Sequence, residues 1–171
     1  MNLKAELERY VMFLLSKREY ATKDLVRCTT ARAKLLLKKN KVETEVRDAV
    51  IEKTITELIE KLTRLGMLSD ERYMRMMVRH QVGRKLGFRA ISLKLKQKGI
   101  TLTSLCFKEL MSDEGVTDTN EHDVGQILEL VKRKYPGYSK DYKIKTRAFG
   151  FLVRRGFSID LIQKALKLDE S

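Results

Sequence analysis

The sequence predicts an all-α fold, and three observations support that prediction. Apolar residues recur at spacings of three and four through most of the chain, which is the period of an amphipathic helix. Only one proline occurs in 171 residues, so the commonest helix breaker is nearly absent. No run of residues alternates between apolar and polar over the length of a strand. We therefore expect about eight to ten mostly short helices, joined by glycine-containing turns.

The first third of the chain predicts successive helical segments. An apolar stripe from Leu3 to Leu15 marks the first segment, and Thr22 is an N-cap candidate for another that carries Leu25. A longer stripe begins near Glu43 and ends where Gly66 provides a helix stop. Its apolar members are Val46, Val50, Ile51, Ile55, Leu58, Ile59, Leu62 and Leu65.

Further helices are expected in the middle of the chain. Ser69 provides an N-cap side chain, and the acids Asp70 and Glu71 that follow suit the positive end of a helix dipole. Gly87 interrupts this helix, and a stripe with Ile91 and Leu95 then runs to a stop at Gly99. The apolar face of the earlier helix consists of Tyr73, Met74, Met77 and Val78.

The last third begins with an acidic segment. Residues 112–123 contain five acids and no lysine or arginine, which predicts a loop or the frayed start of a helix. The helices expected after it are Val124–Val131 ending at Pro136-Gly137, Ile144–Leu152 broken at Gly156, and a last helix capped by Ser158.

A short pattern occurs at three places and suggests an internal repeat. In each copy a basic pair precedes an apolar or aromatic anchor, and a second anchor lies five positions beyond the first. We interpret the pattern as a helix-turn-helix whose anchors enter a local core while the basic pair faces water. The pairs are Lys17-Arg18, Arg84-Lys85 and Arg154-Arg155, with the anchors Tyr20 and Leu25, Leu86 and Ile91, and Phe157 and Ile162.

Composition excludes several functional classes. No apolar run has the length of a membrane span or a signal peptide, so we expect a soluble cytoplasmic protein. Two cysteines and two histidines without a CxxC pair provide neither a disulfide framework nor a zinc site. The chain also lacks a GxxxxGK[ST] loop and a GxSxG elbow. We therefore predict no cofactor, no metal and no enzymatic activity.

The charge balance predicts a polyanion partner. Lys and Arg number 36 against 23 Asp and Glu, a formal net charge of +13. From Arg79 to Lys98 there are seven basic residues and no acid, and from Lys132 to Arg155 there are nine against the single acid Asp141. A further cluster contains Arg32, Lys34, Lys38, Lys39 and Lys41.

Clustered like charges on one helix face repel, and we expect Lys94 and Lys98 to share such a face. A polyanion would relieve that repulsion, and lysine-rich clusters suit phosphate contacts better than base readout. We therefore predict electrostatic binding of single- and double-stranded DNA, with little dependence on sequence. Tyr20, Tyr73, Phe88 and Phe157 are possible stacking platforms for unpaired bases, although two of them are also repeat anchors.

Several motifs together resemble the RecX family, which regulates the bacterial RecA recombinase. Gly87-Phe88 through Ile91 and Leu95 to Gln97-Lys98-Gly99-Ile100 is similar to the central motif of that family. The segment from Leu65 to Tyr73 resembles the stretch before this motif. Leu15 to Leu25 resembles the first repeat, and Phe151 to Phe157 with Ile162 resembles the third. Departures from the usual family residues occur at Met67, Ser69, Leu86, Ala90, Lys94 and Gly150, which affects the expected contact surface more than the core.

The resemblance implies tandem three-helix repeats in an elongated, curved body. It places the first repeat with an extended insertion at residues 1–66, the second at 67–111 and the third at 112–171. It also implies a non-enzymatic inhibitor that binds the RecA–DNA filament and reduces its ATPase, strand-exchange and coprotease activities. We expect the protein to act as a monomer. The residues that we expect to contact the filament or DNA are Arg79, Arg84, Lys85, Arg89, Lys94, Lys96, Lys98, Lys132, Arg133, Lys145, Arg147, Arg154 and Arg155.

Two other interpretations remain open. A helical transcriptional or architectural protein would act on DNA directly, so it would bind DNA tightly without RecA. A module whose basic face meets an acidic protein would have little affinity for nucleic acid at any salt concentration.

Overall fold

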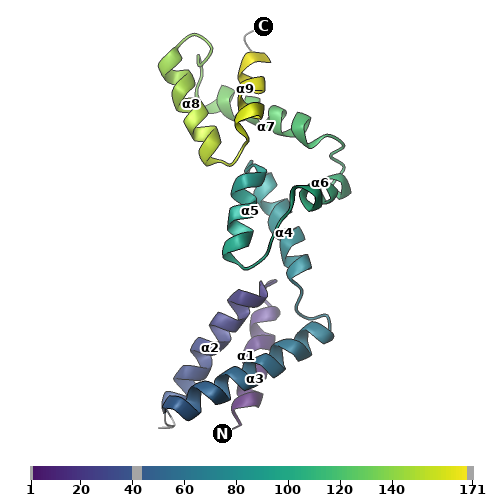
Figure 1. The fold of residues 1–171 in the computed structure, drawn as a ribbon, viewed down its shortest axis with the longest axis vertical. Coiled ribbons are helices and arrows are strands. Elements are labelled where there is room, and N and C mark those ends of the chain that lie inside the picture. The colour runs from purple at the N-terminus through teal and green to yellow at the C-terminus, as the bar shows by residue number, and fades with distance from the viewer. Residues whose placement is uncertain (1, 40–43, 169–171) are drawn as a thin grey trace. The chain divides into compact units, whose positions relative to one another are not determined.

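A computed structural model describes residues 2–39 and 44–168, and within these ranges the chain forms nine α-helices and no strands (Figure 1). The all-α prediction is therefore confirmed. The helices are α1 (Leu3–Leu15), α2 (Thr22–Lys39), α3 (Thr44–Arg64), α4 (Asp70–Gly83), α5 (Phe88–Gln97), α6 (Ser104–Asp113), α7 (Thr119–Lys134), α8 (Tyr142–Arg154) and α9 (Ile159–Leu168). No helix in the described part of the chain has both the length and the apolar character of a membrane span.

The chain divides into two compact units, and the boundary falls within α4. The first unit contains Met1–Met74 and Lys98–Ile100, and the second contains Arg75–Gln97 and Thr101–Ser171. The three repeat boundaries expected from the sequence remain a prediction.

The first unit packs α1, α2 and α3 around one apolar core. Leu7, Leu25 and Leu58 are among its fully buried side chains. Two ion pairs join α1 to α3, with 3.0 Å between Lys4 Nζ and Glu57 Oε2 and 2.9 Å between Lys61 Nζ and Glu8 Oε1. Because these pairs are exposed, the apolar contacts contribute most of the stability.

Two members of the predicted α3 stripe are not in this core. Val50 is 42% exposed and Leu65 is 60% exposed. The buried face of α3 follows Ile51, Ile55, Leu58 and Leu62, so Val50 lies one position off that face. Leu65 lies beyond the last residue of α3, where the helical period no longer sets its direction. The side chain of Val46, another predicted member, lies outside the described residues.

The start of α2 differs from the prediction because Thr22 is its first residue and not its cap. The Thr22 N–H donates to Oδ1 of Asp70, at 2.7 Å and 48 residues away. A carboxylate at a helix N-terminus is favoured by the helix dipole and satisfies one of its orphan donors. The predicted cap of α4 is confirmed, since Ser69 Oγ accepts from the Arg72 N–H at 3.2 Å.

The second unit contains a helix that the sequence analysis missed. The acidic segment was expected to be a loop or a frayed helix start, but α6 ends within it at Asp113 and α7 begins within it at Thr119. Thr103 caps α6, and Asp118 caps α7 through the N–H groups of Asn120 and Glu121. α6 buries Phe107, Leu110 and Met111.

The remaining helices of this unit follow the predicted pattern. α7, α8 and α9 share a core in which Ile127, Leu152 and Ile162 are fully buried. Ser158 caps α9 as predicted, accepting from the Leu161 N–H at 3.3 Å. These helices, together with α5, position the basic residues described next.

Candidate polyanion interface

Two of the three basic pairs meet in space within the second unit. The Gly87 N–H donates to the Arg155 carbonyl at 2.9 Å, and the Arg89 N–H donates to the Gly156 carbonyl at 3.1 Å. These bonds hold the start of α5 against the turn between α8 and α9 (Figure 1). We call the contact between residues 84–90 and 154–157 the junction.

Glycine makes this close approach possible. A Cβ on Gly87 would lie 2.6 Å from the Gly156 carbonyl oxygen, and a Cβ on Gly156 would lie 2.2 Å from the Ala90 nitrogen. Gly156 also has φ +87°, a backbone conformation that favours glycine. The two glycines that the sequence marked as helix breaks are therefore also contact points between helices.

Arg155 is half-buried and bonds across the junction, whereas the repeat pattern predicted that it would face water. Its Nη1 donates to the carbonyl of Arg84 at 2.7 Å and to that of Lys85 at 3.2 Å, across 70 or more residues of sequence. Its guanidinium also lies 5.0 Å from the centroid of the Phe151 ring. Arg155 is thus a structural residue that brings one basic pair to the other.

Three arginines on the junction segments remain exposed: Arg84, Arg89 and Arg154. We call them the junction cations. None of them makes an ion pair within the described residues. Like charges on neighbouring segments repel, so an anion bound beside the junction would be stabilised by these cations.

The helices extend this charge away from the junction. Lys96 lies two turns beyond Arg89 on the same face of α5, and Arg147 lies two turns before Arg154 on the same face of α8. Lys94 is also exposed on α5. The arrangement provides spaced cations on two helices, as phosphate contacts require.

Three other predicted residues form ion pairs within the chain: Arg79, Lys85 and Lys98. Arg79 bonds to Glu114 through its Nε at 2.9 Å, and Lys85 pairs with Glu129. Hydrogen bonding from Lys85 and its charge hold the pKa of the Glu129 carboxyl below its usual range. Lys85 is thus, after Arg155, the second residue of a basic pair that is held by a contact within the chain.

The structure contradicts the expectation that Lys98 shares a helix face with Lys94. It follows α5, which ends at Gln97, and it belongs to the first unit. There its Nζ lies 2.8 Å from Oδ2 of Asp24. Helical spacing therefore does not apply to this pair of lysines.

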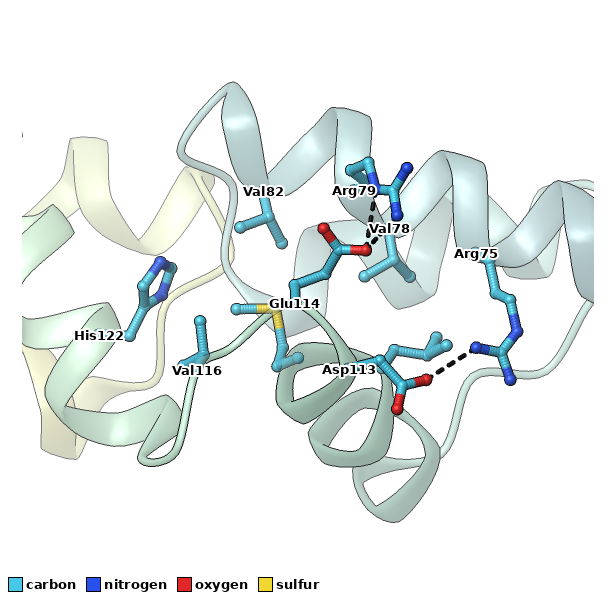
Figure 2. Close-up of a pocket in the computed structure, with 10 residues that line it drawn as sticks. Arg75, Val78, Arg79, Val82, Asp113, Glu114, Val116 and His122 are labelled. Carbon is cyan, nitrogen blue, oxygen red and sulfur yellow. Dashed lines mark hydrogen bonds and ion pairs between the residues drawn. The ribbon is translucent and has the colours of Figure 1, made fainter.

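Figure 2 shows two arginines of α4 paired with acids. Arg75 and Arg79 each reach an acid at the end of α6, and Arg75 Nη1 lies 2.8 Å from Oδ2 of Asp113. A pocket of about 370 Å³ lies beside these ion pairs, lined partly by Val78 and Val82. Its mixed charge does not match that of the junction cations.

The other predicted residues are distributed over α7 and α8. Lys132 and Arg133 are exposed in the last turn of α7, and Lys145 lines a groove between α8 and α9. In the third predicted cluster, Arg32 lies over the Tyr10 ring at 5.7 Å. There Lys34 lies 3.8 Å from Asp48, Lys41 is outside the described residues, and the side chain of Lys39 is not described.

The four aromatic residues predicted to stack on unpaired bases pack against other residues of the chain. Tyr20, Tyr73 and Phe157 are buried, with at most 8% of each residue exposed. Phe88 packs against Phe107, with the ring centroids 5.4 Å apart. The repeat anchors Leu25, Ile91 and Ile162 are fully buried as predicted, while Leu86 is half-buried.

A carboxyl with 13% of its side chain exposed lies beside the junction. Asp123 lines a small pocket of about 180 Å³ together with Arg89 and Gly156. Burial raises the pKa of Asp123 to about 6, and the imidazole of His122, whose Nδ1 lies 3.7 Å from Asp123 Oδ1, partly opposes that rise.

This pKa predicts how stability depends on pH. The folded chain holds the Asp123 proton more tightly than the unfolded chain, so stability is expected to fall as pH rises from about 4 to about 6. Asp123→Asn removes this penalty and is expected to stabilise the protein at pH 7 by about 2 kcal/mol. Urea unfolding from pH 4 to pH 7 tests this, because the variant's advantage should grow across that window. A constant difference would contradict the prediction.

Two family models match the chain, and each match includes one side of the junction. Residues 69–101, which include Gly87, match the family description "RecX, second three-helix domain". Residues 121–166, which include Gly156, match the description "RecX, third three-helix domain". These matches support assignment of the chain to the RecX family.

Individual RecX relatives agree with this assignment. The regulatory protein RecX of Pectobacterium atrosepticum is 29% identical over 163 residues, which cover 91% of this chain and 92% of that protein. The Clostridium perfringens protein of the same name is 26% identical over 146 residues. That match covers 80% of this chain and 66% of the relative, so the chain spans just under two thirds of its length.

A solved RecX structure shows the same fold. The crystal structure of RecX from Lactobacillus salivarius superposes with a TM-score of 0.69 at 20% identity, covering 98% of this chain and 96% of that one. The junction therefore lies in a tandem helical RecX fold and joins segments from two of its three-helix domains.

Proposed function

We propose that this RecX chain is a non-enzymatic regulator that binds RecA–DNA filaments and inhibits their ATPase, strand-exchange and coprotease activities. The observation that carries the proposal is the set of junction cations, which are exposed, unpaired within the described residues and supported by buried backbone contacts. The relatives are named regulatory protein RecX, which supports a regulatory role.

The filament provides what such a surface requires. It repeats DNA phosphates at a regular spacing and adds protein side chains beside them, so a rigid set of cations could engage several of them together. Electrostatic contacts of this kind are individually weak and sum over many pairs. The proposal includes direct electrostatic binding of single- and double-stranded DNA, action as a monomer in the bacterial cytoplasm, and modulation of recombination and the SOS response.

The three predicted repeats are part of the proposal. Residues 67–111 and 112–171 would present the two sides of the junction to the filament. The first repeat, residues 1–66, contributes no residue to the junction.

Single-stranded-DNA-dependent ATP hydrolysis by RecA tests the function, titrated with this protein at two salt concentrations. DNA binding by the protein alone is measured in the same buffers. A protein that makes ~6–10 phosphate contacts loses ~10³–10⁵ in DNA affinity between about 50 and 200 mM salt. We expect inhibition well below the concentration of DNA sites, and we expect it to persist where the protein alone has left the DNA.

The opposite result would support direct action on DNA. Inhibition that requires stoichiometric coating of the DNA, and disappears with salt in step with DNA binding, would show competition for phosphate instead of filament recognition. Absence of inhibition under any condition would overturn the proposed function.

A further inference from the structure

The most exposed aromatic side chain of the described residues lies beside a groove that the sequence analysis did not identify. Tyr142 is the first residue of α8 and is 83% exposed. The groove has a volume of about 500 Å³ and lies between α8 and α9 in the second unit. Its lining residues are Tyr142, Lys145, Thr146, Phe149, Gln163, Leu166 and Lys167.

The lining follows from helical geometry. The four residues from α8 are spaced i, i+3, i+4 and i+7, so they occupy one face of that helix. The three from α9 are spaced i, i+3 and i+4 and form the opposite wall. Phe149 and Leu166 supply apolar surface, while Lys145 and Lys167 supply positive charge from the two sides.

Tyr142 begins a helix whose N-terminus is capped. Asp141 caps α8 and accepts from the Lys143 N–H at 2.7 Å and from the Ile144 N–H at 3.3 Å. This arrangement uses the only acid between Lys132 and Arg155 for a local structural role. Tyr142 is therefore carried by a capped helix, and the segment around it is strongly positive.

We propose that Tyr142 and the groove between α8 and α9 bind an unpaired base of single-stranded DNA, with the ring stacked on the base. An exposed aromatic ring beside cations is the arrangement that binds single strands, because every base has a face for stacking and every nucleotide has a phosphate. A duplex keeps its bases stacked inside and cannot offer one to Tyr142. This inference deepens the proposed function by naming what one surface of the protein recognises on DNA.

Affinity measurements without RecA test the stacking. Tyr142→Leu keeps an apolar side chain but removes the flat ring, and Tyr142→Phe keeps the ring. We expect the affinity for oligothymidylate to fall roughly 5- to 150-fold for Tyr142→Leu and to change less than about twofold for Tyr142→Phe. The affinity for a duplex of equal length should be the same for all three proteins. Because Tyr142 is exposed, thermal unfolding should confirm that both variants fold.

Fluorescence provides a direct readout because the chain contains no tryptophan. Oligothymidylate should quench the emission of Tyr142→Trp in a saturable manner, since a stacked base lies against the indole ring. Leu105→Trp is the matched control, placed at an exposed position of α6 in the same unit. Its emission should change little.

Several results would overturn the inference. They are unchanged single-strand affinity in Tyr142→Leu, an equal loss of duplex affinity, equal quenching in both tryptophan variants, or no single-strand binding by the wild-type protein. RecA ATPase inhibition by the wild-type protein is measured separately and tests the proposed function. A failure of one proposal is therefore distinguishable from a failure of the other.

Discussion

Replacing Gly156 by alanine is expected to destabilise the protein by about 4–6 kcal/mol. The new Cβ would lie 2.2 Å from the Ala90 nitrogen and 2.9 Å from its Cα, and backbone cannot move aside as a flexible side chain can. The junction must therefore open. Opening it breaks the bonds from Gly87 to Arg155 and from Arg89 to Gly156, and the φ of +87° adds conformational strain.

A Gly115→Ala variant distinguishes the cost of backbone strain from the cost of the steric clash. Gly115 has a nearly identical φ of +85°, but nothing lies within 4 Å of its added Cβ. We expect this control to cost about 1–2 kcal/mol, the penalty of the backbone conformation alone. Urea unfolding followed by far-ultraviolet circular dichroism measures both variants. Equal losses would show that the close approach at the junction contributes no stability.

Reversing the charge of the junction cations is expected to abolish most of the RecA inhibition. With Arg84, Arg89 and Arg154 all changed to Glu, the concentration for half-maximal inhibition of RecA ATPase should rise by roughly 100-fold or more. The reason is that each reversal removes an attraction to phosphate and adds a repulsion. The fold should persist, because all three side chains are exposed and Arg155, which holds the junction, is unchanged.

A control with the same change in net charge tests whether position matters. Lys38, Lys53 and Arg64 are exposed residues of α2 and α3, and all three can be changed to Glu. This variant should inhibit RecA within a few-fold of the wild-type protein at moderate salt, since screening weakens distant charges. If both triple variants lose inhibition equally, net charge explains the activity and the junction does not.

The local structure of the chain could be predicted from the sequence because its causes are local. Ser69 and Ser158 cap helices as expected, since a cap needs only a short polar side chain and a donor two or three residues onward. Ile91 and Leu95 on α5 and Ile162 on α9 are fully buried for a similar reason, because the helical period puts each on the apolar face of its own helix. α6 was missed because its short stripe follows a glycine stop and runs into acidic residues.

The candidate site could be predicted only in outline. The acid-free run from Arg79 to Lys98 predicted a basic surface, but the acids that neutralise part of it come from distant segments. Glu114 lies 35 residues from Arg79, and Asp24 belongs to a different helix from the segment that carries Lys98. Spacing within one helix contains no information about such partners. Tyr142 was missed for the same reason, because its exposure depends on how α8 packs against α9.

The sequence by itself determined the helical class, most of the buried helix faces and the resemblance to RecX, since each depends on periodic apolar residues and short motifs. Tertiary structure alone decided which cations are free. It pairs Arg79, Lys85 and Lys98 with acids, turns Arg155 into a link between helices and leaves the junction cations exposed. The physical reason is that charge pairing depends on distances of a few ångströms between residues far apart in the chain, and only packing sets those distances.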